Sequence, residues 1–183
     1  MTVVLASASP RRRHLLTAAG VSIDVRPADV DETPLEGEAP DAYALRVARD
    51  KALAHGLAEP VLAADTVVAL GDEILGKAED VEDAKRTLAK LSGESHVVHT
   101  AVVLAVGGEV EELLVTTAVR FRALSSAEID RYVATGEPMD KAGAYGIQGE
   151  GGALVAEVRG SYTNVVGLPL EETLALLAKR GLV

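Results

Sequence analysis

The chain of 183 residues carries 18 Lys and Arg against 28 Asp and Glu, and its net charge of −10 disfavours long nucleic acid, whose binding depends on many phosphate contacts. It contains no cysteine, which excludes disulfides and thiolate metal sites. No apolar run approaches the roughly 20 residues that span a membrane, so we expect a cytoplasmic protein with no membrane partner. Its 48% hydrophobic content, mostly Ala, Val and Leu, is typical of an α/β core. Its length predicts one domain over residues 1–183, or one core with two lobes.

The stretch 5–16 predicts a short strand, a turn and the start of a helix. Pro10 suits a first helical position because its φ is preset and its missing N–H would be unpaired there, and Ser9 is a good N-cap. Free N–H groups at this helix start, with the Ser7 hydroxyl and the arginines at 11–13 beside them, would form an anion site. A solvated basic helix start explains the three arginines equally well at this point.

An acidic turn and a second helix follow a strand predicted over residues 21–25. The turn, Asp29-Val30-Asp31-Glu32-Thr33-Pro34, carries three carboxylates. Pro40 opens the helix, which we expect to end at Gly56 with Lys51 near its C-terminal end.

A carboxylate lies inside the next predicted strand. Residues 61–70 form a nearly continuous apolar run that predicts a buried strand, and Gly71-Asp72 predicts a turn into a hairpin. Asp65 falls within this run, where a carboxylate is costly unless it is paired, protonated or bound to a metal. We therefore interpret Asp65 as a functional residue, with a structural hydrogen-bonding role as the alternative.

The rest of the chain alternates helices and strands around one glycine-rich loop. A helix capped by Asp80 presents an apolar stripe that begins at Val81. There follow strands over 96–106 and 109–121, a helix opened by a capping box at 125–128, the loop at 141–149, a strand over 153–158, a polar turn at 160–164 and a final helix begun by Pro169. His96 and His99 have no carboxylate or cysteine at metal-like spacing and are interpreted as ordinary strand residues. The whole pattern predicts a mixed sheet with helices packed around it.

Short motifs lie in order along almost the whole chain. They are LASASPRR at 5–12, DVDET at 29–33, LRVARDKA at 45–52, ADTVV at 64–68, LGK at 75–77, LSG at 91–93, DKAGAYGIQG at 140–149 and VVGLPL at 165–170. Together they resemble the Maf family of nucleoside triphosphate pyrophosphatases. Within it, Arg11, Thr66 and Gln148 resemble the branch that acts on dTTP and UTP, whereas the branch acting on 7-methyl-GTP has a different set. Ala78 departs from the usual Pro after Gly-Lys, which should alter loop stiffness and not the role of Lys77.

The resemblance implies both a fold and a reaction. The fold is an elongated mixed sheet flanked by helices, similar to inosine triphosphatases, with two lobes around a central cleft. The reaction uses a divalent cation, Mg²⁺ or Mn²⁺, and releases pyrophosphate and a nucleoside monophosphate. Asp65 matches the proton acceptor of the family, and Arg11, Thr66 and Gln148 match its base-selecting positions. Similar proteins are often dimers, which leaves a homodimer open.

The chemistry of the residues agrees with these roles. Asp65 can orient or deprotonate the attacking water, directly or through a metal, and Glu32 is the second carboxylate expected at a Mg²⁺-like site. The hydroxyl and cationic groups expected to bind phosphate oxygens are those of Ser7, Arg12, Lys51 and Lys77. The Gln148 amide offers a donor and an acceptor to the acceptor–donor–acceptor edge of uracil and thymine.

Two other functions stay open. A regulatory nucleotide-binding protein that affects septum formation without turnover, an effect associated with this family, would use the same anion site. A phosphomonoesterase would release orthophosphate. Asp65 favours an enzyme, because a pure binder gains nothing from a carboxylate beside a phosphate. The expected substrates are dTTP and UTP, with modified pyrimidine nucleotides as further candidates.

Overall fold

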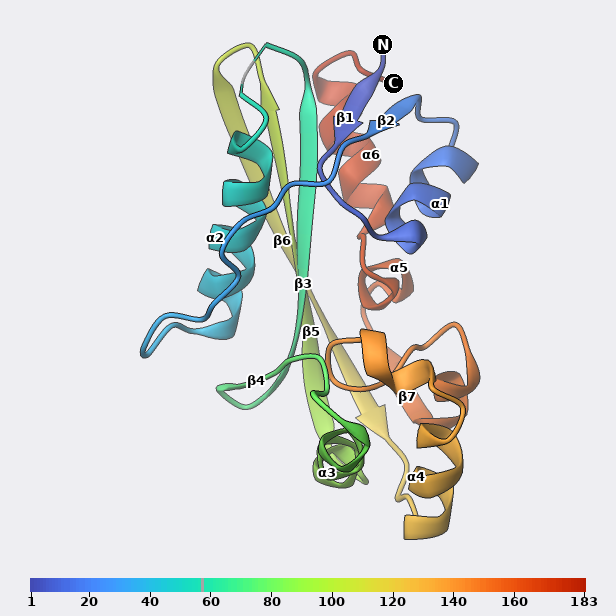
Figure 1. The fold of residues 1–183 in the computed structure, drawn as a ribbon. Coiled ribbons are helices and arrows are strands. Elements are labelled where there is room, and N and C mark those ends of the chain that lie inside the picture. Colours follow the sequence, from blue (N-terminus) through green and yellow to red (C-terminus); the bar gives the residue numbers. More distant parts are fainter. Residues whose placement is uncertain (57) are drawn as a thin grey trace. The chain divides into compact units, whose positions relative to one another are not determined.

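A computed structural model describes residues 1–56 and 58–183 of the protein (Figure 1). The strands are β1 (Val3–Leu5), β2 (Ile23–Val25), β3 (Val61–Leu70), β4 (Glu73–Leu75), β5 (Ser95–Val106), β6 (Glu109–Phe121) and β7 (Val155–Arg159). The helices are α1 (Pro10–Ala18), α2 (Pro40–Leu53), α3 (Val81–Leu91), α4 (Ser126–Val133), α5 (Tyr162–Val166) and α6 (Leu170–Lys179), with 3₁₀ helices η1 (Glu137–Asp140) and η2 (Glu150–Leu154). Among the described residues, every helix is too short or too polar to cross a membrane.

The strands form one mixed sheet of seven. Their order is β2-β1-β3-β5-β6-β7, and β4 pairs with β3 off this path. β1 runs parallel to both β2 and β3, whereas β4 is antiparallel to β3 and β7 is antiparallel to β6. The α/β class and the mixed sheet flanked by helices, both expected from the sequence, are confirmed.

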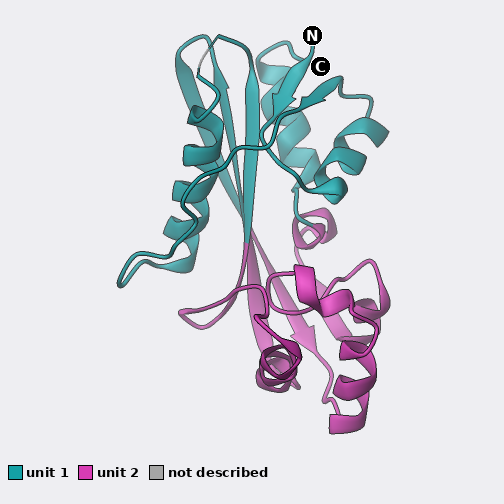
Figure 2. Ribbon diagram, viewed as in Figure 1, with its two compact units in different colours: residues 1–66, 100–115, 167–183 teal, residues 67–99, 116–166 magenta. Residues whose placement is uncertain are grey.

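Figure 2 shows two compact units. Unit 1 comprises residues 1–66, 100–115 and 167–183, and unit 2 comprises residues 67–99 and 116–166. The strands β3, β5 and β6 therefore contribute residues to both units. The cleft expected between two lobes stays a prediction.

The core of unit 1 joins β1 and β3 to helices from both ends of the chain. Leu5, Leu16, Leu62 and Leu177 are fully buried there. The start of α1 is as predicted: Pro10 is the first helical residue, and the Ser9 hydroxyl accepts a hydrogen bond from the N–H of Arg12. This local sequence turns the residues that follow β1 into a helix that packs against β2.

The core of unit 2 forms around Phe121 at the end of β6. His96 of β5 and Tyr145 pack edge-on against the Phe121 ring, with centroids 5.1 and 4.8 Å away. The capping box of α4 is confirmed, because Ser125 and Glu128 accept hydrogen bonds from each other's backbone. These elements support the glycine-rich loop that follows η1.

Several local expectations differ from the structure. The helix expected to end at Gly56 ends at Leu53, and the strand predicted over residues 21–25 begins at Ile23. The polar turn predicted at 160–164 instead leads into α5, because the Ser161 hydroxyl accepts from the N–H of Asn164 and thereby caps a helical turn. Residues 150–154 form η2, so the strand predicted from residue 153 begins at Val155. Val81 is 48% exposed, so the buried stripe of α3 begins at Ala84.

Candidate active site

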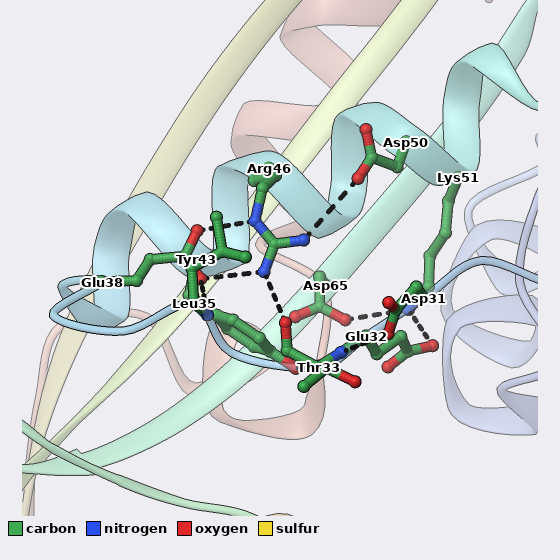
Figure 3. Close-up of polar contacts among 10 residues, drawn as sticks. All are labelled: Asp31, Glu32, Thr33, Leu35, Glu38, Tyr43, Arg46, Asp50, Lys51 and Asp65. Atoms are coloured by element: carbon green, nitrogen blue, oxygen red, sulfur yellow. Dashed lines mark hydrogen bonds and ion pairs between the residues drawn. The ribbon is translucent and has the colours of Figure 1, made fainter.

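One lysine joins two carboxylates from separate segments of unit 1. Lys51, in the last turn of α2, places Nζ 2.9 Å from Oδ1 of Asp65 in the middle of β3. The same Nζ lies 2.9 Å from Oε1 of Glu32, which comes from the loop between β2 and α2 (Figure 3). Asp65 and Lys51 are buried, whereas the Glu32 side chain is 51% exposed. The cost of burying Asp65 is therefore offset by an ion pair, as the apolar strand required.

Burial and charge compete at Asp65. Its pKa is raised above the ordinary value, chiefly because burial disfavours the carboxylate. The positive charges of Lys51 and Arg12 oppose this effect, and the negative charge of Glu32 adds to it. A buried carboxylate with a raised pKa is a stronger proton acceptor than an ordinary aspartate, which suits a general base.

Two residues of α2 fix the loop that carries Glu32. The Tyr43 hydroxyl donates to the Glu32 carbonyl at 2.8 Å, and the Arg46 guanidinium donates to the Thr33 carbonyl at 3.0 Å (Figure 3). Burial, together with the negative charges of Asp65 and Glu32, raises the pKa of Tyr43 to about 12. Tyr43 and Arg46 were missed in the sequence, although the eight-residue spacing of Tyr43 and Lys51 places both on one helix face.

A second network surrounds Arg12 of α1. Its buried guanidinium donates through Nε to the Gly167 carbonyl at 2.8 Å, through Nη1 to the Ser7 hydroxyl at 3.1 Å and through Nη2 to the Thr66 hydroxyl at 3.0 Å. Thr66 also shares a hydrogen bond with Thr100 at 2.9 Å. These contacts use three of the five N–H donors of the guanidinium and fix Ser7 and Thr66 relative to each other. Phosphate binding by Arg12 and Ser7 stays a prediction.

The two networks meet at neighbouring residues of β3. Side chains alternate along a strand, so Asp65 and Thr66 leave β3 in opposite directions, Asp65 toward Lys51 of α2 and Thr66 toward Arg12 of α1. Asp65 and Arg12 nevertheless interact. Burial lowers the pKa of Arg12 and is the larger effect, and the negative charge of Asp65 opposes it. Arg11 lies next to Arg12 on α1 and is partly exposed.

Glu32 and Asp65 are the residues expected to hold a metal ion. Their oxygens lie no more than about 6 Å apart, because each is 2.9 Å from the same Lys51 nitrogen. Among the described residues, no group of three or more His, Cys, Asp or Glu could hold a metal ion. A pair of carboxylates fits Mg²⁺, which is commonly bound by one or two carboxylates and completed by water and substrate phosphates.

The predicted site residues divide between the two units. Unit 1 contains Ser7, Arg11, Arg12, Glu32, Lys51, Asp65 and Thr66. Unit 2 contains Lys77 and Gln148, which are both exposed. Within unit 2, Lys77 forms an isolated antiparallel bridge with Ala142, so its backbone lies beside the segment that leads into the loop with Gln148. The predicted roles of these residues stay predictions.

Comparison with known proteins identifies the family to which this chain is similar. The family described as Maf-like protein matches residues 2–180. A dTTP/UTP pyrophosphatase from Anaeromyxobacter dehalogenans (strain 2CP-C) is 59% identical over 184 residues, which cover 98% of this chain and 94% of that protein. A dTTP/UTP pyrophosphatase from Shewanella sp. (strain MR-7) is 52% identical over 193 residues, which cover all of both chains. The structure of a HAM1 protein from Coxiella burnetii, 18% identical, aligns with a TM-score of 0.51 over 98% of this chain and 99% of that one, and supports the fold alone.

Proposed function

Since the chain belongs to the Maf-like protein family, we propose that it hydrolyses dTTP and UTP to the nucleoside monophosphate and pyrophosphate. The names of the two relatives, at 59% and 52% identity, support these substrates. The structural observation that carries the proposal is the buried Asp65 carboxylate, held at 2.9 Å by Lys51. A protein that only binds nucleotides gains nothing from a buried carboxylate, which is costly to remove from water.

The proposed reaction is water attack at the α-phosphorus. Asp65 orients the water and accepts its proton as the new P–O bond forms, and the bond from the α-phosphorus to the bridging oxygen breaks to release pyrophosphate. Lys51, Arg12 and Ser7 bind phosphate oxygens and neutralise charge, as does Lys77. Because Asp65 ionises against the cost of burial, its proton affinity is higher than that of a solvated aspartate.

A divalent cation is part of the proposal. Glu32 and Asp65 would hold it, and the ion would neutralise phosphate charge and help to activate the water. Lys51 now lies between these two carboxylates, so we expect its ammonium group to move toward the substrate phosphates when the ion binds.

Base selection is assigned to Arg11, Thr66 and Gln148. A Gln amide presents both a donor and an acceptor, and Arg11 and Thr66 supply further donors. A site that hydrogen-bonds the base rejects bases of the wrong polarity strongly, because mismatched groups are left unpaired.

A nucleotide panel tests the proposal. The protein is incubated with Mg²⁺ or Mn²⁺ and each of dTTP, UTP, CTP, ATP and GTP, and the products are identified by chromatography and by separate assays for pyrophosphate and orthophosphate. We expect pyrophosphate together with dTMP or UMP. Orthophosphate alone would indicate a phosphomonoesterase, and tight binding without any product would indicate a regulatory nucleotide-binding protein.

A further inference from the structure

The loop that carries Gln148 is held by one carboxylate of unit 2. Glu137, the first residue of η1, accepts hydrogen bonds from the backbone N–H groups of Glu150 through Oε2 and of Gly151 through Oε1, both at 3.0 Å. Its Oε1 also accepts from the Tyr132 hydroxyl at 2.7 Å. Hydrogen bonds to an ionised acceptor are about twice as strong as neutral ones, so this carboxylate is a strong fastening for a loop backbone.

Tyr132 holds the loop backbone on the other side of Gln148. Its hydroxyl oxygen, on α4, accepts from the N–H of Gly146 at 3.1 Å while the hydroxyl donates to Glu137. The N–H of Gly149 bonds to the Gly146 carbonyl at 3.4 Å and closes a turn in which Gln148 is the third residue. The backbone is thus tied down on both sides of Gln148, whose side chain is exposed.

Two glycines of this loop, Gly149 and Gly151, are explained by the same contacts. A Cβ at Gly149 would overlap the Glu137 carboxylate and lie 2.6 Å from its Cδ. A Cβ at Gly151 would lie 2.5 Å from the Tyr132 hydroxyl oxygen. The φ of Gly149 is −98°, outside the left-handed region, so the close approach of Glu137 is what favours glycine there.

We propose that Glu137, with Tyr132, is a positioning residue for base selection, because it holds the backbone of the turn that presents the Gln148 amide. This inference rests on the proposed function. An amide distinguishes uracil from cytosine only if its donor and acceptor meet the base in one orientation. A long exposed side chain on a mobile turn would not provide that orientation, whereas a turn fixed on both sides removes the backbone part of the freedom.

The test compares two carboxylates that both accept backbone hydrogen bonds. Glu137→Gln puts an amide N–H₂ against a backbone donor, and Glu128→Gln makes the same change at the capping box of α4. For each variant we measure kcat/KM and Kd for dTTP, UTP and CTP. We expect Glu137→Gln to lower the preference for dTTP over CTP by about tenfold or more, because misplacing a binding group by about 1 Å has effects of this size. Glu128→Gln should leave the preference within about twofold, since it touches neither Gly146 nor Glu150.

A second arm asks whether Glu137 acts through Gln148. In a Gln148→Ala background, Glu137→Gln should change the preference no further. An equal loss for all three nucleotides, or an undiminished change without Gln148, would overturn the proposal. If Glu137→Gln does not fold, Tyr132→Phe removes the Gly146 bond and leaves Glu137 bonded to Glu150 and Gly151.

Hydrogen exchange separates this proposal from the proposed function. The amides of Gly146, Glu150 and Gly151 should exchange faster in Glu137→Gln than in the wild type. Unchanged protection would show that Glu137 does not hold the loop backbone. Failure of the wild-type protein to release pyrophosphate would overturn the proposed function instead. The ratio of Kd values would then still decide whether Glu137 controls base preference.

Discussion

Lys51 Nζ lies 2.9 Å from Asp65 Oδ1 and 2.9 Å from Glu32 Oε1, so one ammonium group bridges a buried and an exposed carboxylate. The buried ion pair with Lys51 keeps the Asp65 side chain oriented. Under the proposed function, Lys51 would exchange its contact with the exposed Glu32 carboxylate for a phosphate oxygen of the substrate. Removing either partner of the buried ion pair should therefore have a larger effect than changing Glu32.

Replacing Asp65 with asparagine should abolish pyrophosphate release from dTTP. The new amide retains an oxygen that can accept from Lys51, and the side-chain volume is almost unchanged, so the protein should stay folded. The amide cannot accept a proton from water, so we expect kcat to fall at least about 100-fold. Product release and the thermal unfolding midpoint are measured on the same preparation.

Asp50→Asn is the matched control. Asp50 precedes Lys51 on α2, and its 46% exposed side chain forms a 3.8 Å ion pair with Arg46. Exposed pairs contribute little, so kcat should stay within about twofold of the wild type. Turnover retained by Asp65→Asn would remove Asp65 from the mechanism.

Changing Gln148 to glutamate should alter base preference more than stability. A carboxylate only accepts hydrogen bonds, so it favours the exocyclic amino group of cytosine over the O4 acceptor of uracil and thymine. We expect kcat/KM to fall for dTTP and UTP relative to CTP. The free energy of unfolding should change by no more than about 0.5 kcal/mol, because Gln148 is exposed. Equal losses for dTTP, UTP and CTP would mean that Gln148 does not contact the base.

The elements with strong local patterns were predictable from the sequence. The apolar run at 61–70 and the strands expected over 96–106 and 109–121 correspond to β3, β5 and β6 with almost no error, because burial and strand propensity agree there. Asp65 stands out as a candidate functional residue because a carboxylate in a buried strand contradicts that local pattern.

The partners of the site residues were not predictable in this way. Arg12 contacts Gly167, which is 155 positions away, and no local pattern encodes such a contact. Glu137 looks like an ordinary helix-start carboxylate in the sequence, and only the folded loop brings the N–H groups of Glu150 and Gly151 to it. Long-range hydrogen bonds of this kind depend on the assembled core, where periodicity carries no information about them.

Acid should weaken unit 2 through His96. Burial lowers the pKa of His96 to about 4, and its Nε2 shares a 2.8 Å hydrogen bond with the Tyr145 hydroxyl. In the unfolded chain His96 has a pKa of about 6.5 and takes up a proton below that pH, whereas in the fold it stays neutral down to about pH 4. Stability is therefore at its full value above about pH 6.5 and falls as the pH drops toward about 4. The expected loss between pH 7.5 and pH 4 is about 3 kcal/mol, at about 1.4 kcal/mol for each pKa unit.

The measurement is urea unfolding at several pH values for the wild type and His96→Gln. The carboxylates titrate in both proteins, so their contribution cancels in the difference. We expect the variant to be less stable at pH 7.5, where the aromatic contacts with Phe121 and Tyr145 are lost, but to lose less stability on acidification. Parallel curves for the two proteins would show that His96 does not titrate in this range.

A steric test of the Gln148 loop uses Gly149→Ala. The new methyl group would collide with the Glu137 carboxylate, and forcing an extra carbon into a packed site costs about 1 to 3 kcal/mol. Gly76→Ala, where no atom lies within 4 Å of the added Cβ, should be close to neutral.

In a Glu137→Ala background the colliding carboxylate is absent, so Gly149→Ala should cost much less than it does in the wild type. The double-mutant cycle, measured by urea unfolding, isolates this contact because any effect of alanine on the backbone is the same in both backgrounds and cancels. Additive effects of the two substitutions would place the Glu137 carboxylate away from Gly149, and the close approach that explains this glycine would be wrong.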